Sequence, residues 1–192
     1  KADLHRHLGG ALDLAQQRQV GRAVFDELGT PQRAAALDRV AMLLHDRGEW
    51  PWDWPKQVAG ASRAANCAAL LVGADDDQLR RNLYGVTEPR VALKAGSRGF
   101  AAYERPGELT GSAVLTDPAA IEPYAQALVE QACAEGLTYV ELRGSPHKYR
   151  HKDSAGFLTD LRVAINRACG TFMDPPVFGF LWILDRRQRG TM

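Results

Sequence analysis

The chain has 192 residues, of which 45% are hydrophobic and 24% charged, and its formal net charge is +1. These values are typical of a globular domain with a sizeable core, and the balanced charge argues against a general nucleic-acid-binding protein. No apolar run approaches the roughly 18 residues of a membrane helix, and no signal peptide is evident. Cys67, Cys133 and Cys169 lack the spacing of metal ligands, so we expect reduced cysteines in a cytoplasmic protein.

The first ten residues hold the most informative pattern in the chain. Residues 2–8 predict a short strand that ends at a glycine pair, and side chains alternate between the two faces of a strand. Asp3, His5 and His7 are therefore expected to project from one face. Two imidazoles held in this way suit a divalent metal such as zinc, although His-x-His is short enough to arise by chance. We take His5 and His7 as the candidate metal ligands.

Residues 11–115 predict a series of helices and loops rather than strands. Thr30 and Pro31 are typical of a helix start, and apolar residues then recur at helical spacing. Three tryptophans alternate with prolines at 50–55, which favours a packed loop or a contact between subunits. Residues 80–98 include five basic residues, which indicate either a solvated face or a phosphate-binding surface; they are Arg80, Arg81, Arg90, Lys94 and Arg98.

Two more strands are predicted further along the chain, at 137–143 and 177–184, each preceded by a helical pattern. The second is a nearly continuous apolar run, which is typical of a parallel strand buried on both faces. In the first, Glu141 and Arg143 share a face with Tyr139. Charges on an inward face must be paired, so an ion pair of Glu141 with Arg143 or with another inward cation is the expected arrangement.

Two segments resemble the adenosine deaminase branch of the metal-dependent amidohydrolases. The stretch His5-Arg6-His7-Leu8 with its glycine turn resembles the family's first strand, and YVELRGSPH at 139–147 resembles its second. The resemblance implies an α/β fold, namely the N-terminal portion of a (β/α)8 TIM-type barrel with a large helical insertion after strand 1. Residues 1–192 would then form a partial barrel domain, because a complete barrel has eight strands.

The resemblance also implies a chemistry. In the family, the His-x-His pair, a later His and a late Asp hold a metal that activates water for attack on C6 of adenine, while a Glu protonates the ring. Only the first two ligands have counterparts here, and the Glu has none, so the chain as given is expected to be incomplete and inactive alone. Substrate contacts are expected from the residues that match or neighbour the family's motifs: Gly9, Gly10, Arg143, His147, and Arg186 or Arg187.

One departure from the family concerns the substrate. The common pattern is His-x-His-Leu-Asp-Gly, whose Asp contacts the sugar of a nucleoside, and Gly9 stands in its place. Loss of this acid favours a 5′-phosphorylated adenine compound such as ATP. The long basic insertion resembles deaminases of bacterial antiviral systems, including CRISPR-associated ones, in which an N-terminal sensor domain can precede the deaminase. A homo-oligomer is also expected. A non-catalytic scaffold and an amidohydrolase for a non-purine substrate remain alternatives.

Overall fold

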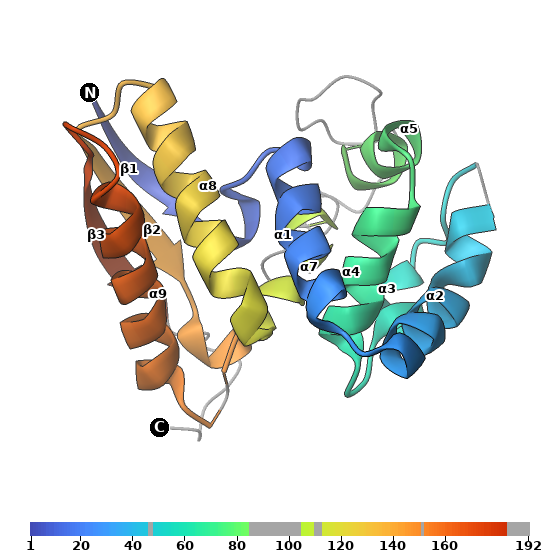
Figure 1. Cartoon of the computed structure of the whole chain (residues 1–192). Coiled ribbons are helices and arrows are strands. Elements are labelled where there is room, and N and C mark those ends of the chain that lie inside the picture. Colours follow the sequence, from blue (N-terminus) through green and yellow to red (C-terminus); the bar gives the residue numbers. More distant parts are fainter. Residues whose placement is uncertain (46–47, 85–104, 110–112, 151, 184–192) are drawn as a thin grey trace.

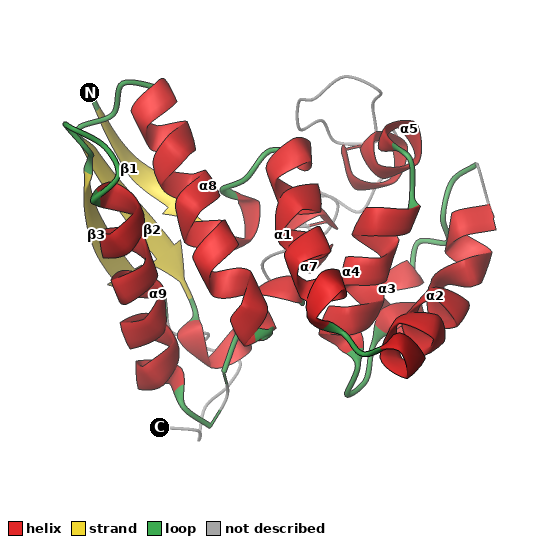
Figure 2. Ribbon diagram, viewed as in Figure 1, coloured by secondary structure: helices red, strands yellow, loops and turns green. Residues whose placement is uncertain are grey.

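The computed structural model of the chain describes residues 1–45, 48–84, 105–109, 113–150 and 152–183. Its strands form one parallel sheet in the order β1-β2-β3; they are β1 (Ala2–His7), β2 (Tyr139–Gly144) and β3 (Val177–Trp182). The strands lie together at one side of the molecule (Figure 1), and helices dominate the rest (Figure 2). The fold is therefore α/β, as the sequence predicts.

Two helices cover one face of the sheet. Parallel strands need long connections, and these contain α8 (Ile121–Ala134) between β1 and β2 and α9 (Ser154–Cys169) between β2 and β3. The two helices lie side by side against the sheet (Figure 1). Val140 and Leu142 of β2 point into this layer and are buried. The two helices contribute buried apolar residues to the same layer, among them Leu128 of α8 and Leu161 of α9.

The connection from β1 to β2 also contains a helical insertion. Its described elements are α1 (Leu14–Glu27), α2 (Thr30–His45), α3 (Trp54–Val58), α4 (Arg63–Gly73), α5 (Asp76–Leu79), the π-turn η2 (Arg80–Tyr84), α7 (Arg105–Leu109), and the 3-10 turns η3 (Val114–Thr116) and η4 (Pro118–Ala120). Within the described ranges, no helix is long and apolar enough to cross a membrane.

Close packing and hydrogen bonds join the insertion to the sheet layer. Helix α1 crosses α4 at Gly21, where a Cβ atom would lie 2.8 Å from Cδ1 of Leu71. At the start of α1, Asp13 and Gln16 cap each other in a capping box. Gln16 also donates from Nε2 to the carbonyl of Ala127 in α8, at 3.2 Å. The insertion and the sheet layer thus share one core.

The third strand differs from its prediction. The apolar run at 177–184 predicted burial on both faces, but Val177 and Leu181 are 65% and 43% exposed. Phe178 and Phe180 alternate with them and pack against the core on the helix side. The prediction of two-sided burial is wrong for the described part of the chain, because α8 and α9 cover only the Phe178 face.

Candidate metal centre

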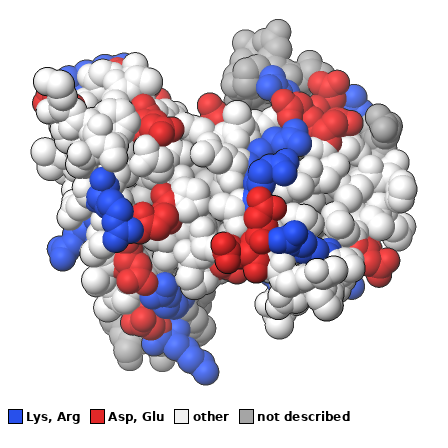
Figure 3. Space-filling model, viewed as in Figure 1, with Lys and Arg blue, Asp and Glu red and all other residues white. Residues whose placement is uncertain are grey.

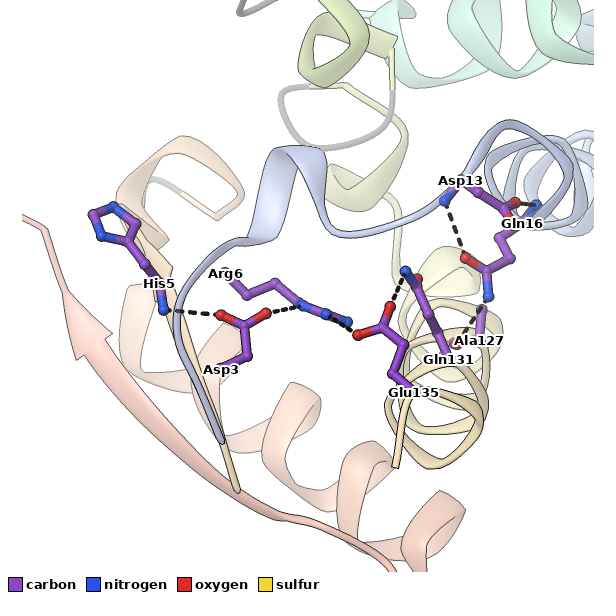
Figure 4. A network of polar contacts seen from close by, with 8 residues as sticks. All are labelled: Asp3, His5, Arg6, Asp13, Gln16, Ala127, Gln131 and Glu135. Atoms are coloured by element: carbon purple, nitrogen blue, oxygen red, sulfur yellow. Dashed lines mark hydrogen bonds and ion pairs between the residues drawn. The ribbon is translucent and has the colours of Figure 1, made fainter. Parts of the chain in front are cut away.

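His5 and His7 lie on the exposed side of β1 with their imidazoles in contact. Their Nε2 atoms are 3.0 Å apart, and the ring centroids are 4.9 Å apart with 41° between the ring planes. One imidazole can donate a hydrogen bond in this contact while the other accepts it. The His5 side chain points away from the helix layer, to the side of β1 opposite Arg6 (Figure 4). The structure thus brings together the two histidines that the sequence singles out.

A bulge in β1 sets which side chains share the histidine face. Two residues of β1, Leu4 and His5, stand opposite one residue of β2, Glu141. Strict alternation therefore fails, and both Asp3 and Arg6 face the helices, where they are partly buried. The prediction that Asp3 lies on the face of the two histidines is wrong, because the extra residue moves it to the opposite face.

A chain of charged side chains ties β1 to the end of α8 on the helix side (Figure 4). Arg6 donates from Nε to Asp3 at 2.8 Å and from Nη2 to Glu135 at 2.5 Å, and Glu135 also accepts from Gln131 at 2.9 Å. The backbone N–H of His5, assisted by Arg6, holds the pKa of Asp3 below its usual value. Burial acts to lower the pKa of Arg6, but its hydrogen bonds to Glu135 and Asp3 outweigh burial and raise it.

The sequence analysis did not identify this network. Its only signal was Arg6, a cation that alternation places on the strand face opposite the two histidines. A buried charge needs a partner. That requirement predicts an acid near Arg6 but does not point to Glu135, which is 129 positions away in the chain.

The histidine pair fits part of a zinc site. Two nitrogens bound to one zinc at 2.0–2.1 Å and at a tetrahedral angle lie roughly 3.3 Å apart. The observed separation of 3.0 Å is close to this value, so both Nε2 atoms can bind one ion after a small adjustment. In the described ranges, no third His, Cys, Asp or Glu joins them as a metal-holding group. Because zinc sites usually have three or four protein ligands, the others would have to come from outside these ranges.

Arg143 lies beside His7 on the same side of the sheet, since the two residues pair across β1 and β2. Its Nη2 is 2.7 Å from Oε1 of Glu141, so the predicted ion pair is present. The same Nη2 donates to the carbonyl oxygen of Leu4 at 3.0 Å. The guanidinium is thus held against the sheet, and its predicted contact with substrate stays a prediction.

The glycine pair follows the histidines in a 3-10 turn, η1 (Leu8–Gly10). Leu8 was predicted to end the strand, but it begins this turn and is buried, and its carbonyl accepts from the hydroxyl of Tyr124 at 2.5 Å. Helix α7 of the insertion lies against the turn at Gly107, where a Cβ atom would be 3.2 Å from the carbonyl oxygen of Gly9. A described segment of the insertion therefore packs directly beside the candidate site.

His147 follows β2 in the turn η5 (Pro146–Lys148), at the same edge of the sheet as the glycine pair. Its Nε2 is enclosed and has no hydrogen-bond partner among the described residues. Ser145 ties this loop to the end of β3 by donating to the carbonyl of Ile183 at 2.7 Å. His147 does not join the two histidines of β1 in a three-residue metal group.

The predicted phosphate-binding residues are only partly within the described ranges. Arg186, Arg187 and three of the five basic residues at 80–98, namely Arg90, Lys94 and Arg98, lie outside them. Arg80 is 3.7 Å from Asp76, which also pairs with Arg18. On the face shown in Figure 3, basic and acidic side chains are interspersed over the described elements. This mixture of charges favours the interpretation of a solvated surface over that of a phosphate-binding surface on the face shown.

The tryptophan-rich loop is mostly part of the core. Trp50 and Trp54 are 5% and 2% exposed and pack edge to face, and the indole N–H of Trp50 donates to the carbonyl of Leu43. Trp52 is 37% exposed and lies under the guanidinium of Arg105, at 3.9 Å from its ring centroid. The prediction of a packed segment is correct for Trp50 and Trp54, although Trp54 begins helix α3 and does not lie in the loop. A role in oligomerisation stays a prediction that now depends on Trp52.

Comparison of the chain with protein-family models, with curated proteins and with solved structures found no match.

Proposed function

We propose that this chain contributes the first three strands of a deaminase-type barrel whose histidine pair holds a divalent metal, most suitably zinc. The reaction would be the hydrolytic deamination of an adenine nucleoside or nucleotide. The observation that carries the proposal is the contact between the Nε2 atoms of His5 and His7. This contact lies on the open face of a parallel sheet whose order follows the chain, which is the arrangement expected for one wall of a barrel.

The residues of this chain would have distinct tasks. His5 and His7 would hold the metal, which supplies activation of water at neutral pH when bound. The turn at Gly9 and Gly10 lies directly beyond them, at the carboxyl edge of the sheet, where parallel barrels bind their substrates. Gly10 has open space around its Cα, because a Cβ atom there would meet nothing within 4 Å. This space supports a substrate position next to the two histidines.

The proposed substrate is a 5′-phosphorylated adenosine, with ATP as the first candidate. Position 9 is a glycine and not an acid, so no carboxylate at this position would repel a phosphate bound beside the turn. Arginines outside the described ranges, Arg186 and Arg187 among them, are the candidates for phosphate contacts. Each charge-assisted hydrogen bond contributes about 1.5–3 kcal/mol, which corresponds to roughly ten- to hundredfold in kcat/KM for one good contact.

The experiment follows the ultraviolet absorption change when adenine becomes hypoxanthine, with adenosine, AMP and ATP as substrates. It uses the intact natural protein that contains this chain, with zinc present and with cyclic oligoadenylates added in case a sensor domain controls activity. We expect turnover of ATP at least tenfold above that of adenosine in kcat/KM, and loss of turnover in His5→Ala and His7→Ala. Equal turnover of adenosine would refute the phosphate argument and leave the deaminase proposal standing.

A second candidate is a non-catalytic binding or scaffold module, which has the deaminase-type fold but not the deaminase activity. The observation that favours it is that the described part of the chain offers no third metal ligand. Zinc binding without turnover of any adenine compound would support this candidate, and it would contradict the deaminase proposal.

A further inference from the structure

One peptide group in the β1 bulge is held by side chains at both of its polar atoms. Its carbonyl oxygen, on Leu4, accepts from Nη2 of Arg143 at 3.0 Å. Its N–H, on His5, donates to Oδ1 of Asp3 at 3.1 Å. A bulge leaves its extra residue out of the backbone ladder, so the polar groups there need other partners. Arg143 and Asp3 supply them.

Each of these two side chains is fixed in turn by a partner of opposite charge. On the open face, Arg143 is 2.7 Å from Glu141, and the two side chains are only 26% and 24% exposed. On the helix face, Asp3 accepts from Arg6 at 2.8 Å, and Arg6 is anchored to Glu135 of α8 (Figure 4). Side chains on both faces of the sheet therefore fix the Leu4–His5 peptide. The contact on the helix face extends through Arg6 to helix α8.

The Leu4–His5 peptide directly precedes the Cα atom of His5. Its orientation therefore determines where the His5 imidazole lies relative to that of His7, two residues further along the strand. A rotation of this peptide would separate the two Nε2 atoms, which are now 3.0 Å apart. We propose that Arg143 and Asp3 are positioning residues, which fix the Leu4–His5 peptide and so hold the two imidazoles at a metal-binding separation. The metal part of this inference rests on the proposed function, whereas the positions of the rings do not.

The test compares Arg143→Met with a matched control, Arg150→Met. Arg150 is 29% exposed and pairs with Asp160 at 2.7 Å and with Asp153 at 3.5 Å, so the control removes ion pairs that do not involve β1. Two quantities are measured on the intact natural protein: the zinc affinity, by competition with a chromogenic chelator, and the nuclear Overhauser effect between ring protons of His5 and His7 without metal. Loss of groups that orient metal ligands typically costs ten- to hundredfold in affinity.

We expect Arg143→Met to weaken zinc binding at least ~tenfold and to abolish the ring-to-ring signal, while Arg150→Met changes neither. Thermal unfolding checks that both variants remain folded. A folded Arg143→Met that keeps the zinc affinity and the ring contact would overturn the inference and leave the proposed function intact. If the intact wild-type protein binds no zinc, the metal proposal fails, and the ring-to-ring signal alone decides the positioning role.

A second pair of variants keeps the inference testable if Arg143→Met does not fold. Asp3→Asn retains an oxygen that can accept from the His5 N–H, whereas Asp3→Ala does not. We expect Asp3→Asn to keep the ring contact and Asp3→Ala to lose it. Loss of the contact in both variants would show that charge on the helix face, rather than the hydrogen bond to the peptide, sets the ring positions, and this result would also overturn the inference.

Discussion

Replacing Gly144 with alanine tests how tightly the end of β1 packs against β2. A Cβ atom at Gly144 would lie 2.6 Å from Cδ1 and 3.3 Å from Cγ of Leu8, and Leu8 is only 2% exposed, so the leucine has little room to move. Overpacking a filled core costs about 1–3 kcal/mol, whereas the lower entropy of the unfolded chain returns about 0.4–1 kcal/mol. We therefore expect Gly144→Ala to lower the free energy of unfolding by about 1–2 kcal/mol.

Gly179→Ala is the matched control, since it adds the same methyl group to the neighbouring strand. Its Cβ would meet the hydroxyl of Tyr139, a half-buried ring on the open face that can turn away. Urea denaturation followed by circular dichroism measures both variants. We expect Gly179→Ala within about 0.5 kcal/mol of wild type. Equal stability of the two variants would refute the argument that Leu8 is tightly packed beside the candidate site.

Other buried groups give further tests. Tyr124→Phe removes the donor to the buried Leu8 carbonyl, and urea denaturation should show that the free energy of unfolding falls by about 1–3 kcal/mol. An unchanged free energy of unfolding would mean that this hydrogen bond does not stabilise the turn. Burial raises the pKa of Tyr124 well above its usual 10.0, so the folded state retains the phenol proton. Stability should be full below pH 10 and should fall above it, and a urea midpoint that is constant up to pH 11 would contradict this. Burial also raises the pKa of the Cys67 thiol to about 12, so a thiol reagent at pH 8 should label Cys133 and Cys169 before Cys67; early labelling of Cys67 would disprove its burial.

The strand that carries the histidines was predictable, because both its glycine stop and its His-x-His pattern are local. The bulge was not, since a bulge depends on which residue of β2 stands opposite each residue of β1. That register is set by packing between segments more than 130 positions apart. A single inserted residue reverses the face of every side chain before it, which is why Asp3 was assigned to the wrong face.

In other parts of the chain, the burial of side chains was harder to predict than the secondary structure. Trp50 lies in a proline-rich segment whose sequence leaves open a packed loop or a contact between subunits, and the Leu43 carbonyl satisfies its indole N–H and allows it into the core. Val177 and Leu181 belong to an apolar run that looks fully buried, yet their burial depends on what covers the open face of the sheet. In both cases the local pattern identifies the element, and tertiary contacts decide which side chains are enclosed.

The central claim is that His5 and His7 form one metal-binding pair, and a zinc titration tests it most directly. The variants are His5→Ala and His7→Ala, with His45→Ala as the control, because His45 is an exposed histidine at the end of α2. In the intact natural protein we predict one zinc ion per wild-type molecule, an affinity at least ~tenfold weaker in either variant of the pair, and no change in the control. Zinc binding that is equal in all four proteins, or absent from the intact wild-type protein, would contradict the claim.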